Sequence, residues 1–365
     1  MGTIRYRASP AAGAEGAFPV AFESVKMAAS PLRVCLVGLG RAGKFHLQSL
    51  RMMDDAVLCC VCDADEERSR AVAEDWGCDA ASPEAGISRS DVDAVIVATP
   101  TQTHFGFVNL GLDAGKPVFT EKPLGSHLRE IDACFEKAAG AKLPLFVGFQ
   151  RRFDPSFASL VRSVHDHTIG ELQFVRSVSR DNPVPSSDYI RDSGGIFHDC
   201  LVHDLDMLVH LFRRPPEQVS AFGGSFIPEI SVHGDYDNVV VALSFGGGAV
   251  ASIDINRKSV YGYDQRIEAF GDLGMVQADN RPTTTVATAD VRGVLRPCIE
   301  YSFPTRYREA YLAELQCFVR CVRGEEATPI THEDVRTNFL LACACETAAR
   351  EQRVVRLEEV EPGLP

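Results

Sequence analysis

Residues 32–43 read LRVCLVGLGRAG and decide the fold of the first half of the chain. An apolar run ends at Val37, three glycines follow at Gly38, Gly40 and Gly43, and a helical pattern of apolar residues comes next. A strand, a glycine turn and a helix in this order are typical of a dinucleotide-binding unit. The first glycine makes the tight turn, the second lets the backbone approach a pyrophosphate, and the third lets the helix pack closely on the strand. We therefore expect a cofactor to contact Gly38, Gly40, Arg41, Ala42 and Gly43.

An acidic residue downstream supports this interpretation. A second strand is predicted over 57–62 and ends in Asp63, where a carboxylate binds the ribose hydroxyls of NAD and repels the 2′-phosphate of NADP. NAD is therefore the expected cofactor, although Arg68 and Arg70 in the next helix would weaken the preference over NADP. The alternative is that Asp63 only caps that helix.

Strands and helices continue to alternate along the chain. The further predicted elements are a strand over 92–98, a helix over 105–114, a strand over 117–119, a helix over 126–139 and a strand over 145–148. This alternation predicts an α/β fold with a doubly wound parallel sheet of the Rossmann type. Ligands of such sheets bind beyond the carboxyl ends of the strands. The cofactor site is therefore expected to include Thr99, Pro100, His104, Glu121 and Lys122.

The length of the chain predicts two folded domains, because 365 residues exceed what one hydrophobic core usually holds. We expect the Rossmann domain over 32–149 and an α+β domain over 150–365, whose strand-like segments between 218 and 301 predict a large, open, mostly antiparallel sheet. Residues 1–31 are rich in Ala, Gly, Pro and Ser and are predicted to be a disordered extension. Their basic residues suit a transit peptide, but Glu15 and Glu23 do not.

Charge and composition exclude several classes of partner. The formal net charge of -13 argues against binding to nucleic acid or to an anionic membrane surface. No apolar run approaches the roughly 18 residues that a membrane span needs. The twelve cysteines follow no disulfide or metal-binding spacing and fit a reducing compartment, so we expect a cytoplasmic protein that handles a small molecule.

The segment 194–206, GGIFHDCLVHDLD, carries the candidate acid–base chemistry. It is predicted to be a helix entered through glycines, in which Asp199 and His203 share one face with Cβ atoms about 5–6 Å apart. A secondary alcohol releases hydride only as its hydroxyl proton leaves, and an imidazole suits that transfer near neutral pH. The alternative is that Asp199 and His203 are only neighbours on one helix and take no part in catalysis. Asp206 and His210 extend the stripe toward a metal site, but no second group of ligands is evident, so no metal is expected.

Three further motifs carry a family resemblance: TPTQTH at 99–104, EKP at 121–123 and GGIFHDCLVHD at 194–204. With the glycine turn, they make the chain resemble the superfamily of glucose–fructose oxidoreductase and inositol dehydrogenase, from Leu32 to the C-terminal helices. The resemblance implies that His203 is the general base, that Asp199 acts with it, and that Lys122 steadies the developing alkoxide. It also implies metal-free catalysis and a homo-oligomer, a dimer or tetramer, formed through the open sheet.

The resemblance also implies the substrate contacts, which are Arg151, Arg180 and one of the tyrosines Tyr261 and Tyr263. The implied activity is the NAD-dependent oxidation of a secondary hydroxyl of a cyclic polyol, with myo-inositol converted to an inosose. The sequence departs from many inositol dehydrogenases at Gln150, where they have Met, and from some at Arg180, where they have His. The alternatives are a sugar or trans-dihydrodiol dehydrogenase of the same superfamily and a non-catalytic regulatory protein that binds a dinucleotide.

Overall fold

The computed structural model describes residues 30–360. The predicted disordered extension over 1–31 lies almost entirely outside the described residues, and with it the possible transit peptide. Within residues 30–360, no helix combines the length and apolar character that crossing a membrane requires.

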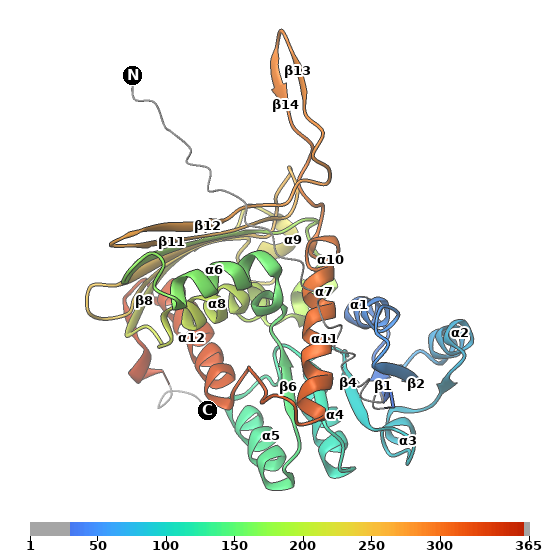
Figure 1. The fold of residues 1–365 in the computed structure, drawn as a ribbon. Coiled ribbons are helices and arrows are strands. Elements are labelled where there is room, and N and C mark those ends of the chain that lie inside the picture. The colour runs from blue at the N-terminus through green and yellow to red at the C-terminus, as the bar shows by residue number, and fades with distance from the viewer. Residues whose placement is uncertain (1–29, 361–365) are drawn as a thin grey trace, which may run out of the picture. The chain divides into compact units, whose positions relative to one another are not determined.

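Six parallel strands form the first sheet, in the order β3-β2-β1-β4-β5-β6. They are β1 (Leu32–Val37), β2 (Ala56–Cys62), β3 (Asp79–Ala80), β4 (Ala94–Val97), β5 (Val118–Glu121) and β6 (Leu145–Gly148). The helices that connect them are α1 (Arg41–Leu50), α2 (Glu66–Trp76), α3 (Pro83–Ile87), α4 (Thr101–Asp113) and α5 (Leu128–Ala141), seen around the sheet in Figure 1. The strand order reverses between β1 and β4, where doubly wound sheets bind ligands. The predicted Rossmann fold is confirmed.

Two glycines of the turn after β1 are required by the backbone. Gly38 has a φ of +96°, and a Cβ atom there would lie 2.5 Å from the carbonyl oxygen of Ala98 at the end of β4. A Cβ atom on Gly43 would lie 2.0 Å from the carbonyl oxygen of Gly38. Any side chain at either position would push α1 away from the sheet, which agrees with the packing role predicted for Gly43.

The second sheet has seven strands in the order β12-β11-β7-β10-β9-β8-β15, and only the β7–β10 pair is parallel. The strands are β7 (Leu172–Arg180), β8 (Gln218–Gly224), β9 (Asn238–Ser244), β10 (Val250–Asn256), β11 (Asp264–Gly271), β12 (Gly274–Ala278) and β15 (Val355–Arg356). Three helices lie against one face of this sheet, namely α6 (Pro155–His165), α8 (Val202–Phe212) and α12 (His332–Glu351) (Figure 1). The mostly antiparallel sheet agrees with the sequence analysis.

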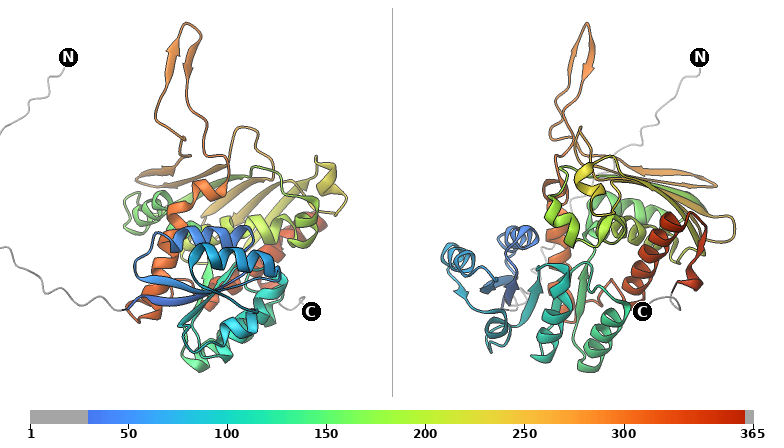
Figure 2. Two further views of the ribbon diagram at one scale, coloured as in Figure 1. Left: turned by 90° about the vertical axis from the view of Figure 1, so that its right-hand side faces the viewer. Right: turned by 180° about the vertical axis from the view of Figure 1, so that it is seen from behind.

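Shorter elements complete the fold. They are the 3-10 turns η1 (Gln150–Phe153) and η3 (Leu357–Glu359), the π-helical turn η2 (Phe197–Leu201), and the short helices α7 (Ser187–Asp192), α9 (Pro228–Ser231) and α10 (Phe303–Arg306). A two-stranded hairpin of β13 (Thr288–Asp290) and β14 (Gly293–Leu295) projects away from the second sheet in both views of Figure 2. This hairpin was not predicted.

Helix α11 (Arg308–Val322) returns the chain to the first sheet. Its residues Leu315, Phe318 and Val319 belong to the same hydrophobic cluster as β1, β4 and β5. The Phe318 ring packs edge-to-face against Phe119 of β5, with ring centroids 5.8 Å apart. A helix that the sequence analysis counted in the second domain therefore completes the core of the first.

Glu314 is a fully buried acid on the same helix. It is 0 % exposed, and neither of its carboxylate oxygens has a hydrogen-bond partner within residues 30–360. Burial, with the negative charges of Glu121 and Asp206, raises the pKa of Glu314 well above the usual 4.5. The folded protein therefore keeps Glu314 protonated at pH values above 4.5, where the same side chain is ionised in the unfolded chain.

We predict that Glu314→Gln becomes more stable than the wild type as the pH rises. Below about pH 4.5 the acid is neutral in both states, so the two proteins should unfold alike; above it only the wild type binds a proton on folding and loses stability. By pH 8 the variant should unfold about 1–2 °C higher, the shift expected for ~1 kcal/mol in a chain of this size. Glu309→Gln, at an exposed position of the same helix, is the control. If the difference in unfolding temperature between Glu314→Gln and the wild type does not increase with pH, Glu314 is ionised in the folded protein.

Candidate active site

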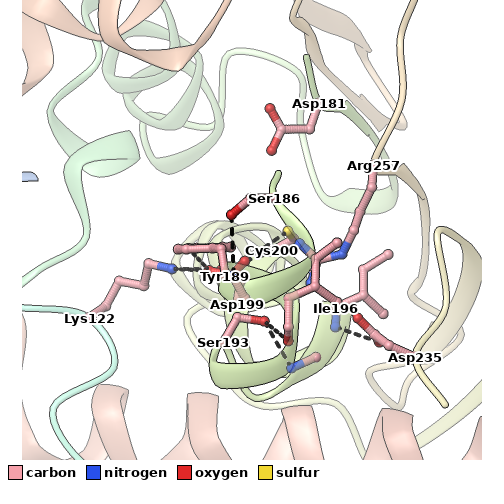
Figure 3. A network of polar contacts seen from close by, with 12 residues as sticks. Lys122, Asp181, Ser186, Tyr189, Ser193, Ile196, Asp199, Cys200, Asp235 and Arg257 are labelled. Carbon is pink, nitrogen blue, oxygen red and sulfur yellow. Dashed lines mark hydrogen bonds and ion pairs between the residues drawn. The ribbon is translucent and has the colours of Figure 1, made fainter. Parts of the chain in front are cut away.

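The three predicted catalytic groups come from different elements. Lys122 directly follows β5 of the first sheet, Asp199 lies in η2, and His203 lies at the start of α8. The Lys122 ammonium donates to the Asp199 backbone carbonyl at 2.6 Å and contacts the carboxylate oxygen Oδ1 at 3.3 Å (Figure 3). Both side chains are nearly buried, at 14 % and 11 % exposed. The contact joins the edge of the first sheet to the second domain.

The helix around Asp199 differs from the prediction. Instead of one α-helix over 194–206, the chain forms a π-helical turn at Phe197–Leu201 before α8 begins at Val202. Gly194 and Gly195, both at a φ of +82°, precede this turn. Single π turns often occur at functional sites. Within residues 30–360 Asp199 bonds Lys122, Tyr189 and Arg257 but not His203, so the joint role of Asp199 and His203 stays a prediction.

His203 is held neutral by its surroundings. Burial, with the positive charges of Lys122 and Arg151, lowers the pKa of His203 well below 6.5. Its ring lies edge-on to Phe149, with centroids 6.4 Å apart, and its Nδ1 atom is buried without a partner among the described residues. A neutral imidazole near pH 7 has the protonation state that a general base requires.

Asp199 is held as a carboxylate. Burial alone would raise the pKa of Asp199, but the charges of Lys122 and Arg257 outweigh burial and, with hydrogen bonds from Tyr189 and Arg257, lower the pKa to about 2. The Tyr189 hydroxyl donates to Oδ1 at 2.9 Å, and Arg257 donates from Nη1 to Oδ2 at 3.1 Å. Donors from three separate segments therefore fix the orientation of this carboxylate.

The sequence analysis missed Arg257 and Tyr189. Arg257 is 0 % exposed, and its Nη2 also contacts Asp235 at 3.4 Å (Figure 3). Asp235 in turn accepts the backbone N–H of Ile196 at 3.0 Å, which fixes the start of the π-helical turn. The one available signal for Arg257 was its place directly after the strand-like residues that form β10. Nothing in the local sequence of Tyr189 pointed to the site.

The glycine turn fits a pyrophosphate. Gly40 is the N-cap of α1 and makes no side-chain cap, and a Cβ atom on Gly40 would meet nothing within 4 Å. The first N–H groups of α1, starting at Arg41 and Ala42, have no carbonyl partner within the helix and follow a residue with no side chain, which is the arrangement that binds phosphate at a helix N-terminus. These residues fit the predicted cofactor.

Asp63 lies beside this turn. Its Oδ2 accepts the Leu39 backbone N–H at 2.7 Å, and its Oδ1 accepts that of Asp65 at 2.9 Å. The alternative that Asp63 caps α2 is wrong, because Asp65 is the N-cap and accepts the Arg68 N–H. Arg68 also approaches the Asp63 carboxylate, with Nη1 3.3 Å from Oδ1.

His104 connects the two predicted strand ends. One ring nitrogen lies 2.8 Å from the carbonyl oxygen of Thr99 and the other lies 2.7 Å from that of Pro123. The Lys122–Pro123 bond is cis. His104 is buried, and burial lowers its pKa although the two carbonyl groups at its ring nitrogens act in the opposite direction. His104 therefore ties the end of β4 to the peptide after Lys122.

Two other predicted cofactor residues, Pro100 and Glu121, have structural roles within the protein. Pro100 is the N-cap of α4. The Glu121 carboxylate contacts His46 of α1 at 2.7 Å, and its side chain is 12 % exposed. Contacts of either residue with the cofactor stay predictions.

The four predicted substrate residues do not gather in one place. Arg151 is buried, donates to Asp204 at 2.9 Å and to Ser179 at 3.0 Å, and contributes to the low pKa of His203. Tyr263 is buried on the same side, 5.9 Å from the ring of Tyr307.

Arg180 and Tyr261 belong to the opposite face of the second sheet. Successive residues of a strand point to opposite faces, and Ser179 bonds Arg151 on the helix-covered face, so Arg180 points to the open face. There it bonds Asp254 and the Tyr261 hydroxyl, the latter at 3.0 Å. The structure therefore does not bring Arg180 and Tyr261 together with His203, and their contact with substrate stays a prediction.

The metal alternative receives no support from the geometry. Asp206 is paired with Arg152 at 2.6 Å, and Asp199 is paired with Lys122 and Arg257. Among the described residues, the groups close enough to share an ion are Cys35 with Cys60 and Cys62, and Cys317 with Cys321 and Glu326. Neither group includes the predicted stripe. In the first cluster, thiols of β1 and β2 lie together in the core, which the spacing of the cysteines in the sequence did not reveal.

Comparison with protein families identifies both halves of the chain. Residues 32–149 match the model of an oxidoreductase family with an NAD-binding Rossmann fold, and residues 157–277 match the GFO/IDH/MocA C-terminal domain. A myo-inositol 2-dehydrogenase of Thermotoga maritima is 42 % identical over 90 % of this chain and 99 % of its own length. An inositol 2-dehydrogenase of Rhizobium meliloti is 37 % identical over 88 % of this chain and 98 % of its own.

A solved structure agrees with these relatives. The scyllo-inositol dehydrogenase of Lactobacillus casei, determined with NAD(H) and scyllo-inositol, superposes with a TM-score of 0.84 at 26 % identity and covers 90 % of this chain and 100 % of its own. The chain has the glycine turn, the cis Lys122–Pro123 peptide and the paired Lys122 and Asp199. It belongs to the GFO/IDH/MocA family of NAD-binding oxidoreductases.

Proposed function

We propose that this protein is an NAD-dependent dehydrogenase that oxidises a secondary hydroxyl of a cyclic polyol, with myo-inositol converted to an inosose. The observation that carries the proposal is the Lys122–Asp199 contact next to a half-buried, neutral His203. The names of the relatives in Thermotoga maritima and Rhizobium meliloti support inositol as the substrate.

His203 acts as the general base in this proposal. Because its pKa is low, His203 is unprotonated at neutral pH and can accept the hydroxyl proton on a ring nitrogen. The Nδ1 atom, which has no partner within residues 30–360, is available for a hydrogen bond with a substrate hydroxyl. Bound NAD⁺ supplies the hydride acceptor.

Lys122 steadies the oxygen that loses its proton. An ammonium has three N–H donors, and two of those on Lys122 point to the carbonyl and carboxylate of Asp199. The third remains for the substrate oxygen, where a positive charge in a nearly buried site stabilises a developing alkoxide. Asp199 holds the ammonium in this orientation and balances its charge.

Two alternatives differ in measurable ways. A sugar or trans-dihydrodiol dehydrogenase of the same family would use the same three groups with another substrate. A non-catalytic dinucleotide-binding protein would not need a neutral His203 beside Lys122, so the geometry favours an enzyme.

We predict NADH formation from NAD⁺ and myo-inositol, and a loss of kcat of about 10²–10⁴-fold in His203→Gln, the contribution typical of a positioned general base. His210→Gln, on the same helix and without a proposed role, is the matched control and should stay within about threefold. Initial rates of NADH formation over a panel of inositols, aldoses and dihydrodiols measure both effects. Turnover of an aldose but no inositol would replace the substrate, and equal rates for His203→Gln and wild type would refute the mechanism.

We also propose that Asp63 makes the protein select NAD over NADP. Its carboxylate lies beside the glycine turn and is anchored by the Leu39 N–H, where it would repel a 2′-phosphate. The Arg68 guanidinium already lies beside this carboxylate, so it would attract the 2′-phosphate of NADP once the negative charge of Asp63 is removed.

Asp63→Ser should lower kcat/KM for NAD and raise it for NADP, changing the ratio by roughly a hundredfold, or about 2.7 kcal/mol. Asp65→Ser removes the same charge two residues away, keeps an N-cap for α2 and should change the ratio by less than about threefold. Steady-state rates with both cofactors test the prediction. Equal changes in the two variants would mean that general charge, not the position of Asp63, sets the preference.

The open face of the second sheet is proposed to bind another copy of this chain. An apolar row crosses four adjacent strands through directly paired residues, namely Met275, Phe270, Phe174 and Val250. Three of them are 41–49 % exposed. An exposed apolar row of this length on a sheet marks a surface for association. We keep the prediction of a dimer or tetramer, and of a cytoplasmic location, where the twelve free cysteines would stay reduced.

A double variant, Val250→Asp with Phe270→Asp, should convert the protein to a monomer, because two carboxylates per copy would face each other across a desolvated contact. Val354→Asp places the same charge at an exposed apolar position outside the row and should leave the mass unchanged. Light scattering after size exclusion gives the mass. A monomeric wild type, or a double variant that keeps the wild-type mass, would rule out this face.

A further inference from the structure

Tyr189 of α7 contacts two parts of the site with two parts of one side chain. Its ring lies under the guanidinium of Arg41, with the guanidinium carbon 5.1 Å from the ring centroid. Its hydroxyl donates to Oδ1 of Asp199 at 2.9 Å (Figure 3). Burial and the charge of Asp199 raise the pKa of Tyr189, so the hydroxyl stays protonated and can donate.

The ring contact fixes Arg41, the first residue of α1. The same guanidinium lies 4.6 Å from the ring centroid of Phe303, so two aromatic rings from the second half of the chain hold it. Both distances are within the range of cation–π attraction. Arg41 is also part of the turn proposed to bind the pyrophosphate, so the position of this side chain bears on cofactor binding.

The hydroxyl contact fixes Asp199. Tyr189 and Lys122 share the oxygen Oδ1, and Arg257 takes Oδ2. Hydrogen bonds from all three donors are directional, so together they fix the rotation of the carboxylate. Of these three donors, Tyr189 is the one whose ring also contacts Arg41 of the cofactor turn.

We infer that Tyr189 is a positioning residue that couples the cofactor turn to the catalytic carboxylate, with its ring holding Arg41 and its hydroxyl holding Asp199. The inference rests on the proposed function for its catalytic half only. A dinucleotide that settles on the turn fixes Arg41, Arg41 fixes the ring of Tyr189, and the ring fixes the hydroxyl on Asp199. Cofactor binding thereby prepares Asp199 and Lys122 before the polyol arrives.

Two substitutions separate the halves of the side chain. Tyr189→Phe keeps the ring and removes the hydroxyl, whereas Tyr189→Leu removes both. Tyr301→Phe, at an exposed tyrosine distant in sequence, is the matched control. NADH affinity, measured from the fluorescence of the bound nucleotide, reports the ring contact without any substrate.

We expect Tyr189→Phe to bind NADH within about twofold of the wild type and Tyr189→Leu to bind it about 3–10-fold more weakly, the size of one lost cation–π contact. With the polyol substrate, Tyr189→Phe should lower kcat about tenfold while KM for NAD stays unchanged, because a hydrogen bond to a charged group is lost. A merely structural tyrosine would not split the two constants in this way.

Each outcome decides a separate point. Equal NADH affinity for the Phe and Leu variants would overturn the coupling, whatever the enzyme oxidises. An unchanged kcat in Tyr189→Phe would overturn the catalytic half. If the wild type oxidises no polyol, the proposed function fails, and the NADH affinities alone then support or overturn the role of Tyr189.

Discussion

The ion pair between Lys122 and Asp199 is the contact on which the site depends. It joins a lysine at the end of a Rossmann strand to a carboxylate in the second domain, and both side chains are nearly buried. Taking two charges out of water is costly, and the cost is repaid only when further hydrogen bonds complete their surroundings. Tyr189, Arg257 and the Asp199 carbonyl supply those bonds. The arrangement holds Asp199 ionised and leaves one Lys122 donor without a partner among residues 30–360.

The scaffold places each partner of this ion pair by ordinary packing and hydrogen bonding. His104 bonds the peptide after Lys122, and α11 closes the core beneath β5 with Phe318. On the other side, Arg257 and Asp235 hold the start of the π-helical turn. The two sides come from distant parts of the chain, so a small displacement of either domain would separate Lys122 from Asp199. We expect the cofactor, which contacts the first sheet, to reinforce this alignment.

Local sequence was informative wherever one short segment specified both structure and chemistry. The glycine turn and the alternating strands of the first sheet were predicted from such segments and are confirmed. The predicted α-helix around Asp199 was wrong because a π turn adds one residue to a turn without a distinctive pattern. Arg180 and Tyr261 could not be placed from the motif, since which face a strand residue occupies depends on register.

The sequence by itself determined the Rossmann domain, the turn that suits a dinucleotide, and the identity of Lys122, Asp199 and His203 as candidates. The Rossmann domain, the turn and the spacing of Asp199 and His203 follow from residue order over a few turns of chain, where backbone geometry leaves few choices, whereas the family resemblance implied the role of Lys122. Only the tertiary structure decided that Arg257 and Tyr189 hold Asp199, and that three thiols of β1 and β2 meet in the core. Such contacts join residues far apart in sequence, and their energies depend on burial and on neighbouring charges that exist only after the chain has folded.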